Sequence, residues 1–246
     1  MNQNFAPIVV WQPTPTWGLP SASPFCLKLE TWFRMAGIPY VAKHVTGPAK
    51  SKSGKMPYIE RPDGSLMWDS SLIIETLTRE RNVTLDEGLA KTDQTLGLLV
   101  QRIFEEDLYF FIIYDRWVDE TGWKLTSEAY FGALPLLLRA LVVPMVRRQV
   151  ISAARGQGVS RLPAAYRDKK GTAAIGAIAD VLGEKQYFLG RPSSIDAVAY
   201  GFLANLLWSP VRSAVSDSVR NHANLVSFCN RMKETYWKDW TPPKAG

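Results

Sequence analysis

Residues 53–77 constrain the fold most strongly, because they place two short strands and a helix start close together in the chain. The strands, 56–60 and 65–68, flank a Pro-Asp-Gly turn, and a proline stands near the start of the first strand. A helix is expected to begin at Asp69 and Ser70, where the first backbone N–H groups have no partners within the helix. This position suits a bound carboxylate.

The chain before this stretch predicts a strand, a helix and a second strand. Residues 8–11 form a short apolar strand. Ser23 and Pro24 then start a helix, with the serine as its cap and the proline in the first turn, where a missing N–H costs nothing. Residues 40–45 form the next strand, and a strand–helix–strand unit implies a right-handed parallel crossover. Residues 1–82 are therefore expected to form an α/β domain.

Only helical patterns follow the polar segment near residue 80. The helices are expected at about 90–120, 130–154, 163–183, 196–208 and 218–236. The clearest signal is Ser193 with Asp196, a variant of the capping box, before a run that is apolar nearly all round. A helix of this kind lies at the centre of a bundle, so residues 90–246 are predicted to form an all-helical domain.

Composition limits the possible classes of protein. The N-terminus has no basic and apolar leader, so no signal peptide is expected. The most apolar run, 133–146, is shorter than the about 20 residues that span a bilayer, and it predicts buried helix rather than a membrane span. The only cysteines are Cys26 and Cys229, which favours a reducing cytoplasm. The only histidines, His44 and His222, lie near no other metal-ligating residue, so no metal site is expected.

The formal charge of +6 is unevenly distributed. Residues 105–120 are mostly acidic, whereas residues 139–170 are strongly basic. Either these are solvated faces that partly pair with each other, or the basic region attracts an anionic ligand or a membrane surface. No nucleic-acid-binding module accompanies the charge, so nucleic acid is not an expected partner.

The Gly-Lys-Met-Pro sequence that ends at Pro57, together with Asp69 and Ser70, resembles the glutathione-binding half of the glutathione transferase superfamily. The resemblance implies a thioredoxin-like N-terminal domain followed by the all-helical C-terminal domain of these enzymes. Further motifs are similar to the metaxin and failed-axon-connections branch. Because the C-terminal residues show no hydrophobic anchor, a soluble member of that branch is expected. These motifs are Leu19–Glu30, Met35–Tyr40, the region from Arg147 to Gly158, and Pro192–Asp196.

The resemblance also implies roles for the residues that match its motifs. Pro57 would be cis, and the backbone of Met56 would pair with the cysteine of glutathione, the co-substrate. Asp69 would bind the ammonium group of the γ-glutamyl end, and Ser70 with its N–H would bind the carboxylate. Lys55 could reach another carboxylate of glutathione, or could be solvated.

The Ser-Pro-Phe-Cys sequence at the helix start leaves alternatives open. It resembles both the start of serine-type glutathione transferases and a glutaredoxin motif with the first cysteine replaced. In the first case the Ser23 hydroxyl stabilises the thiolate of glutathione; Ser21 is the competing hydroxyl, and helix capping alone is the simpler role. Cys26 is then a small buried residue rather than a resolving cysteine.

Three functions follow. The first is a glutathione transferase acting on a small hydrophobic electrophile. Tyr109 and Arg116 are either part of the pocket for this second substrate, or packing and surface residues. The second is a non-catalytic binding or adaptor protein of the metaxin type, and the third is a glutathione-dependent thiol reductase that uses Cys26. Transferases of this fold usually dimerise, so a homodimer is expected.

Overall fold

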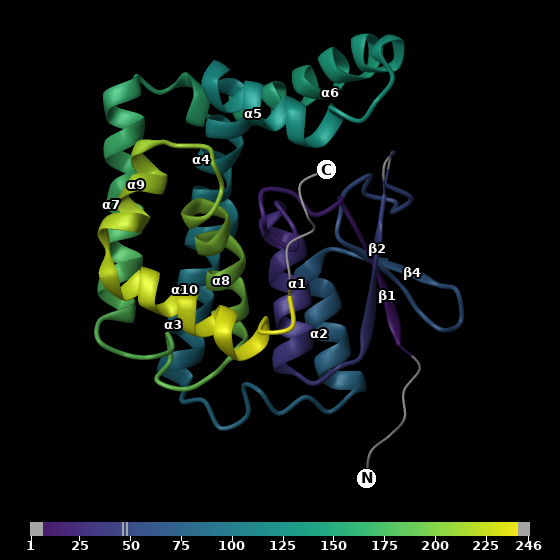
Figure 1. Ribbon diagram of the computed structural model, residues 1–246. Helices are drawn as coiled ribbons and strands as arrows, with labels where there is room; N and C mark the ends of the chain where they lie inside the picture. Colours follow the sequence, from purple (N-terminus) through teal and green to yellow (C-terminus); the bar gives the residue numbers. More distant parts are fainter. Residues whose placement is uncertain (1–6, 46, 48, 241–246) are drawn as a thin grey trace.

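The computed structural model describes residues 7–45, 47 and 49–240, and it consists of a small sheet covered by helices beside a larger helical half (Figure 1). The sheet has the order β2-β1-β3-β4, with β1 parallel to β2 and the other pairs antiparallel. The elements of this half are β1 (Ile8–Gln12), α1 (Pro24–Met35), β2 (Tyr40–His44), β3 (Tyr58–Glu60), β4 (Leu66–Trp68) and α2 (Ser70–Glu80). The predicted thioredoxin-like arrangement is confirmed.

Alternation along β1 explains how the sheet is covered. Ile8 and Val10 point to the same side and are fully buried, as the period of two in a strand requires. They pack with Trp32 of α1 and with Ile73 of α2 in one apolar cluster. Both helices therefore cover the same face of the sheet.

The rest of the chain is helical. Its elements are α3 (Lys91–Arg102), α4 (Tyr109–Ile113), α5 (Glu120–Phe131), α6 (Leu136–Gln157), α7 (Ala164–Leu182), α8 (Ser194–Leu207), α9 (Ala214–Asn221) and α10 (Ala223–Tyr236). Two π-helical segments, Ile103–Leu108 and Tyr114–Val118, flank α4, and a short 3₁₀ turn, Val159–Arg161, follows α6. The predicted boundary between 82 and 90 falls in the connection between α2 and α3.

Two helix boundaries differ from the prediction. α5 occupies part of the gap expected between 120 and 130, because Asp119 caps its start by accepting a hydrogen bond from Gly122 N at 3.0 Å. The helix expected at 218–236 is interrupted at His222, and α9 begins earlier, after the capping box of Ser213. Short polar caps thus outweighed the continuous apolar periodicity.

The helix α8 joins the two halves. Nearly all of its residues are buried, and the Ser193–Asp196 capping box is present, with Asp196 Oδ2 accepting from Ser193 N at 2.9 Å. Gly201 lies so close to α1 that a Cβ there would be 2.6 Å from the carbonyl oxygen of Pro24. Only glycine permits this approach, because a methyl group at that distance would overlap the backbone. α1 is therefore packed between the sheet and the helical half.

The prediction of a buried helix at 133–146 is wrong. In α6, Leu136 and Leu137 are 83% and 84% exposed, and Leu141 and Met145 are 76% and 65% exposed. Figure 1 shows α6 extending from α5 away from the body of the helical half. Polar contacts tie the helix to its neighbours, for example where Arg147 Nε donates to Trp117 O at 3.1 Å, but they leave these four apolar side chains uncovered. Within the described part of the chain, no helix combines the length and apolar character needed to cross a membrane.

Candidate functional site

Ser23 occupies the N-cap of α1, as predicted. Its Oγ accepts a hydrogen bond from Cys26 N at 3.4 Å, and its side chain is half-buried. Ser21 is fully buried, and its Oγ accepts from Ser23 N at 3.3 Å. Of the two competing hydroxyls, only that of Ser23 has access to solvent, and its long cap bond is easily exchanged for a ligand.

The Met56–Pro57 peptide bond is cis, which confirms the expectation drawn from the motif. It directly precedes β3, whose Tyr58 pairs with Trp11 of β1, so the bond is fixed at the end of a central strand. Pro57 is buried and Met56 is half-buried, whereas Lys55 is exposed. The arrangement leaves backbone groups of Met56 next to an ordered strand, as extended binding of a peptide requires.

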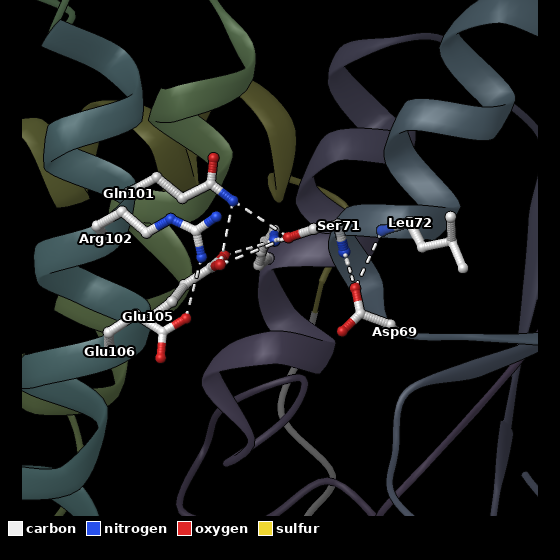
Figure 2. Close-up of polar contacts among 8 residues, drawn as sticks. Asp69, Ser71, Leu72, Gln101, Arg102, Glu105 and Glu106 are labelled. Atoms are coloured by element: carbon white, nitrogen blue, oxygen red, sulfur yellow. Dashed lines mark hydrogen bonds and ion pairs between the residues drawn. The ribbon is translucent and has the colours of Figure 1, made fainter. Parts of the chain in front are cut away.

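Asp69 caps α2 from a left-handed backbone conformation, with φ of 72°. Figure 2 shows its carboxylate turned back onto the helix, where Oδ1 accepts from Ser71 N at 2.9 Å and from Leu72 N at 3.0 Å. Asp69 is exposed, while Ser70 is buried as the first residue of the helix. A non-glycine residue with positive φ costs of order 1–3 kcal/mol, and such residues cluster at binding sites.

No hydrogen bond among the described residues joins Ser23 to Met56 or to Asp69, so the fold rather than direct contact places them. A buried network below Asp69 fixes the start of α2. Lys28 Nζ of α1 donates to Ser71 Oγ at 2.7 Å and to Glu105 Oε1 at 2.6 Å, and the side chains of the ion pair are 1% and 8% exposed.

Gln101 completes this network from α3. Its Nε2 donates to Ser71 Oγ and to Glu105 Oε2, both at 3.1 Å, as Figure 2 shows. Burial lowers the pKa of the Lys28 ammonium, although the nearby Glu105 carboxylate opposes this shift. The network ties α1, α2 and α3 together at one point, so the position of the α2 N-terminus depends on the helical half. The sequence did not single out either member of the ion pair.

The helical half also holds the loop before Ser23. The buried guanidinium of Arg116 donates to Ala22 O and, at 3.0 Å, to Asn205 Oδ1. Asn205 Nδ2 in turn donates to Ser21 O at 3.2 Å, and the hydroxyl of Tyr130 donates to Ala22 O at 3.5 Å.

Sequence reasoning placed Arg116 in the second pocket, in packing or at the surface; it is 4% exposed and lies behind the loop. Burial lowers the pKa of Arg116, and its hydrogen bonds to Ala22 O, Asn205 O and Asn205 Oδ1 end on neutral oxygens. A cation with these partners produces a positive potential at the start of α1, the end at which the helix dipole is also positive.

Aromatic rings line the approach to the same loop. Trp17 stacks on Tyr130 with centroids 5.9 Å apart and on the guanidinium of Arg116 at 4.9 Å. Tyr109 meets Phe25 of α1 edge to face at 4.9 Å, and burial raises its pKa to about 12. Tyr109 therefore contributes apolar packing and a neutral hydroxyl near α1.

Cys26 is fully buried, and burial raises the pKa of its thiol to about 12. The thiolate is the reactive form of cysteine, so this thiol is inert at neutral pH. Within residues 7–240, apart from 46 and 48, no group of three or more His, Cys, Asp and Glu residues could hold a metal ion.

Comparison with known proteins agrees with this geometry. The sequence model of the glutathione S-transferase N-terminal domain matches residues 24–122, and that of the glutathione S-transferase C-terminal domain matches residues 171–232. The chain is 32% identical to an isoprene-epoxide–glutathione S-transferase of Rhodococcus sp. (strain AD45), covering 93% of this chain and 99% of that protein.

The chain is also similar over most of its length to proteins of the metaxin and failed-axon-connections branch. Failed axon connections of Drosophila melanogaster is 28% identical over 95% of this chain, which spans 59% of that longer protein. The mitochondrial outer membrane import complex protein metaxin of Arabidopsis thaliana is 28% identical over 90% of this chain and 70% of its own length.

Solved structures share the fold. A glutathione S-transferase of Methylobacterium radiotolerans, in complex with glutathione sulfonate, superimposes with a TM-score of 0.58 at 16% identity, covering 98% of both chains. A glutathione transferase of Phanerochaete chrysosporium gives a TM-score of 0.62 at 15% identity, covering 94% of this chain and 98% of its own. The two matched domains, the cis bond before Pro57 and these relatives lead to one conclusion. This chain belongs to the glutathione transferase superfamily, in the part that includes the metaxins and failed axon connections.

Proposed function

We propose that this chain is an active glutathione transferase that uses Ser23 to activate the thiol of glutathione. The observation that carries the proposal is the hydroxyl of Ser23, which is accessible at the N-terminus of α1 while Ser21 is buried. The relative that is named for an isoprene epoxide supports a small, hydrophobic epoxide as the class of electrophile.

The site supplies what the chemistry needs. A free thiol has a pKa of about 8.5, and only its thiolate attacks carbon. The Ser23 hydroxyl would donate to the sulfur, while the α1 dipole and the buried Arg116 guanidinium favour negative charge there. Lowering the thiol pKa by about two units corresponds to about 2.7 kcal/mol.

In the reaction, the thiol proton is lost to solvent and the sulfur forms a bond to an epoxide carbon. The carbon–oxygen bond breaks, and the resulting alkoxide takes a proton from water. Glutathione would lie along the first-domain site, with its cysteine backbone on Met56. Its γ-glutamyl ammonium would bind Asp69, and its carboxylate would bind the N–H of Ser70, with Lys55 near another carboxylate.

A binding or adaptor function is the second candidate, favoured by the similarity to metaxins over most of the chain. The glutathione transferase fold would then serve only to present binding surfaces to a partner. The third candidate, a thiol reductase, has no support from the geometry, because the Cys26 thiol is buried and its pKa is raised.

A calorimetric titration with reduced glutathione, combined with turnover of a small epoxide, tests the proposal. Asp69→Ala should weaken glutathione binding, whereas Asp63→Ala, which removes an exposed carboxylate from the β3–β4 turn, should not. Ser23→Ala should keep glutathione affinity and lose at least tenfold in kcat, while Ser53→Ala serves as its control.

Thermal melts of each variant establish that the fold is intact, since losing the Asp69 cap alone costs about 1 kcal/mol. If millimolar glutathione gives no saturable heat, the transferase function is excluded and the adaptor function is favoured. If Ser23→Ala keeps the kcat of wild type, glutathione binding remains supported but Ser23 has no role in activating the thiol.

A further inference from the structure

The first half of α6 exposes an apolar stripe. Leu137, Leu141 and Met145 follow one another at intervals of four residues, so they lie on one side of the helix. Their exposed fractions are 84%, 76% and 65%, and Leu136 beside them is 83% exposed. Isolated exposed leucines are common on soluble proteins, but a contiguous stripe on a projecting helix marks a contact site.

The same face becomes basic in the second half of the helix. Arg148 and Arg155 are exposed, and neither forms an ion pair within the part of the chain that the structure describes. By contrast, Arg139 pairs with Glu128 at 3.0 Å and Arg147 with Glu120 at 2.7 Å. Thus two cations remain available next to the apolar stripe.

The surrounding sequence reinforces this charge. Residues 129–167 contain no aspartate or glutamate, but they contain arginine at 139, 147, 148, 155, 161 and 167. The carboxylates that pair with Arg139 and Arg147 come from α5, and Arg167 pairs with Asp168 just beyond the segment. A partner for this face must therefore offer both an apolar phase and negative charge at its boundary.

We propose that α6 docks this chain onto an anionic phospholipid bilayer, lying in the plane of the interface. The α6 surface consists of Leu136, Leu137, Leu141, Met145, Arg148 and Arg155. The apolar side chains would enter the boundary between headgroups and acyl chains, and the arginines would bind lipid phosphates. The helix is not apolar enough to span the bilayer, which is consistent with peripheral binding.

A second copy of the chain fits this surface less well. A symmetric contact would place α6 against its own copy, because the same patch meets itself across a twofold axis. Whichever way the two helices run, neither acid-free segment supplies a carboxylate for Arg148 and Arg155 of the other copy. A bilayer has no such conflict, since its phosphates neutralise the arginines. Binding of α6 to a bilayer would not require catalytic activity.

Sedimentation with lipid vesicles tests this docking surface. Wild-type protein is mixed with phosphatidylcholine vesicles, either pure or with about a quarter phosphatidylglycerol, and the bound fraction is measured at several lipid concentrations. Leu137→Ser/Leu141→Ser removes the centre of the stripe, and Arg148→Glu/Arg155→Glu reverses the free charges. Val41→Ser/Leu66→Ser is the matched control, because it removes two exposed apolar side chains from the sheet, at 46% and 37% exposure.

Wild type and the Val41/Leu66 control should bind the anionic vesicles and bind pure phosphatidylcholine at least tenfold more weakly. The Leu137/Leu141 variant should lose at least tenfold in partitioning. The Arg148/Arg155 variant should lose at least fivefold per arginine, because one basic residue near an anionic surface contributes about that factor.

The proposal would be overturned if wild type and all variants bound the anionic vesicles equally weakly. It would also be overturned if the Val41/Leu66 control lost as much binding as the α6 variants. Sedimentation equilibrium without lipid tests the alternative that a second copy of the chain covers the α6 surface. If wild type self-associates and Leu137→Ser/Leu141→Ser alone abolishes this, α6 binds a second copy and the bilayer proposal fails. Circular dichroism of each variant confirms that the fold is retained, which these exposed positions should permit.

Discussion

Glu105→Gln isolates the energetic role of the buried ion pair that joins the two halves. The substitution keeps the shape of the side chain and removes only its charge, so the Lys28 ammonium is left buried beside neutral groups. Both side chains are nearly inaccessible, at 1% for Lys28 and 8% for Glu105, and their charged atoms are 2.6 Å apart. Removing one partner of such a pair costs about 3 kcal/mol, which lowers the Tm of a chain of this size by about 6 to 12 °C.

The adjacent residue provides the control. Glu106 pairs with Arg102 at 3.1 Å, but these side chains are 63% and 61% exposed, and Figure 2 shows them on the neighbouring part of the same helix. Glu106→Gln should therefore change stability by less than about 0.5 kcal/mol, because solvent screens the exposed pair. Denaturant unfolding of the three proteins, followed by tryptophan fluorescence, measures both effects.

The pH dependence adds a sharper test. Burial already lowers the pKa of Lys28 from its usual 10.5, and the loss of Glu105 should lower it further. The folded state then binds fewer protons than the unfolded state, so the stability of Glu105→Gln rises with pH up to the unfolded pKa. The difference in the free energy of unfolding between wild type and Glu105→Gln should therefore shrink between pH 7 and about 9.5. A deficit below about 1 kcal/mol at pH 7, or one that is independent of pH, would refute the reasoning.

Three further outcomes are expected. Gly201→Ala should destabilise the protein by at least about 2 kcal/mol in calorimetry, because its Cβ would overlap Pro24 O; an unchanged Tm would mean that α1 and α8 separate freely. Burial raises the pKa of Glu30 to about 7 from 4.5, so the folded state retains a proton that the unfolded state loses, and stability falls as pH rises through this window. Glu30→Gln should abolish the loss of stability that the titration of Glu30 causes, and should be more stable than wild type at pH 8 by about 1–3 kcal/mol. An equal dependence of the unfolding free energy on pH in both proteins would contradict this. Leu98 and Leu99, which are 52% and 57% exposed on α3, are the expected contact of a homodimer. Leu98→Asp/Leu99→Asp should yield monomers in sedimentation equilibrium, whereas a monomeric wild type would exclude the dimer.

Much of the first domain could be predicted because its signals are local. The Ser23 cap and the helix start after Asp69 each depend on a few adjacent residues whose backbone preferences are strong. The cis bond before Pro57 was expected only from the resemblance to glutathione transferases, because X-Pro bonds by themselves favour trans. The alternation of β1 similarly fixes which side chains face the helices. These parts needed no knowledge of distant neighbours.

The remainder depended on tertiary contacts that the sequence does not display. The apolar run in α6 indicated burial, since composition cannot tell whether a neighbouring element covers it. The burial of Lys28 and Arg116 could not be predicted, because the partners that permit it are Glu105 and Asn205, far away in the chain. Such long-range pairings are fixed only once the two halves pack together.

The two π-helical segments have a consequence for how this helix can change in evolution. Glu105 lies in the first segment and Arg116 in the second, and these are the side chains that reach α1 and its preceding loop. In an uninterrupted α-helix, the gain or loss of one residue rotates every later residue by about 100°. A π turn accommodates one more residue than an α turn, so the same change within it is absorbed locally. The π segments therefore confine the effect of a gained or lost residue to the turns that hold Glu105 and Arg116, and they leave the helix beyond each turn in phase.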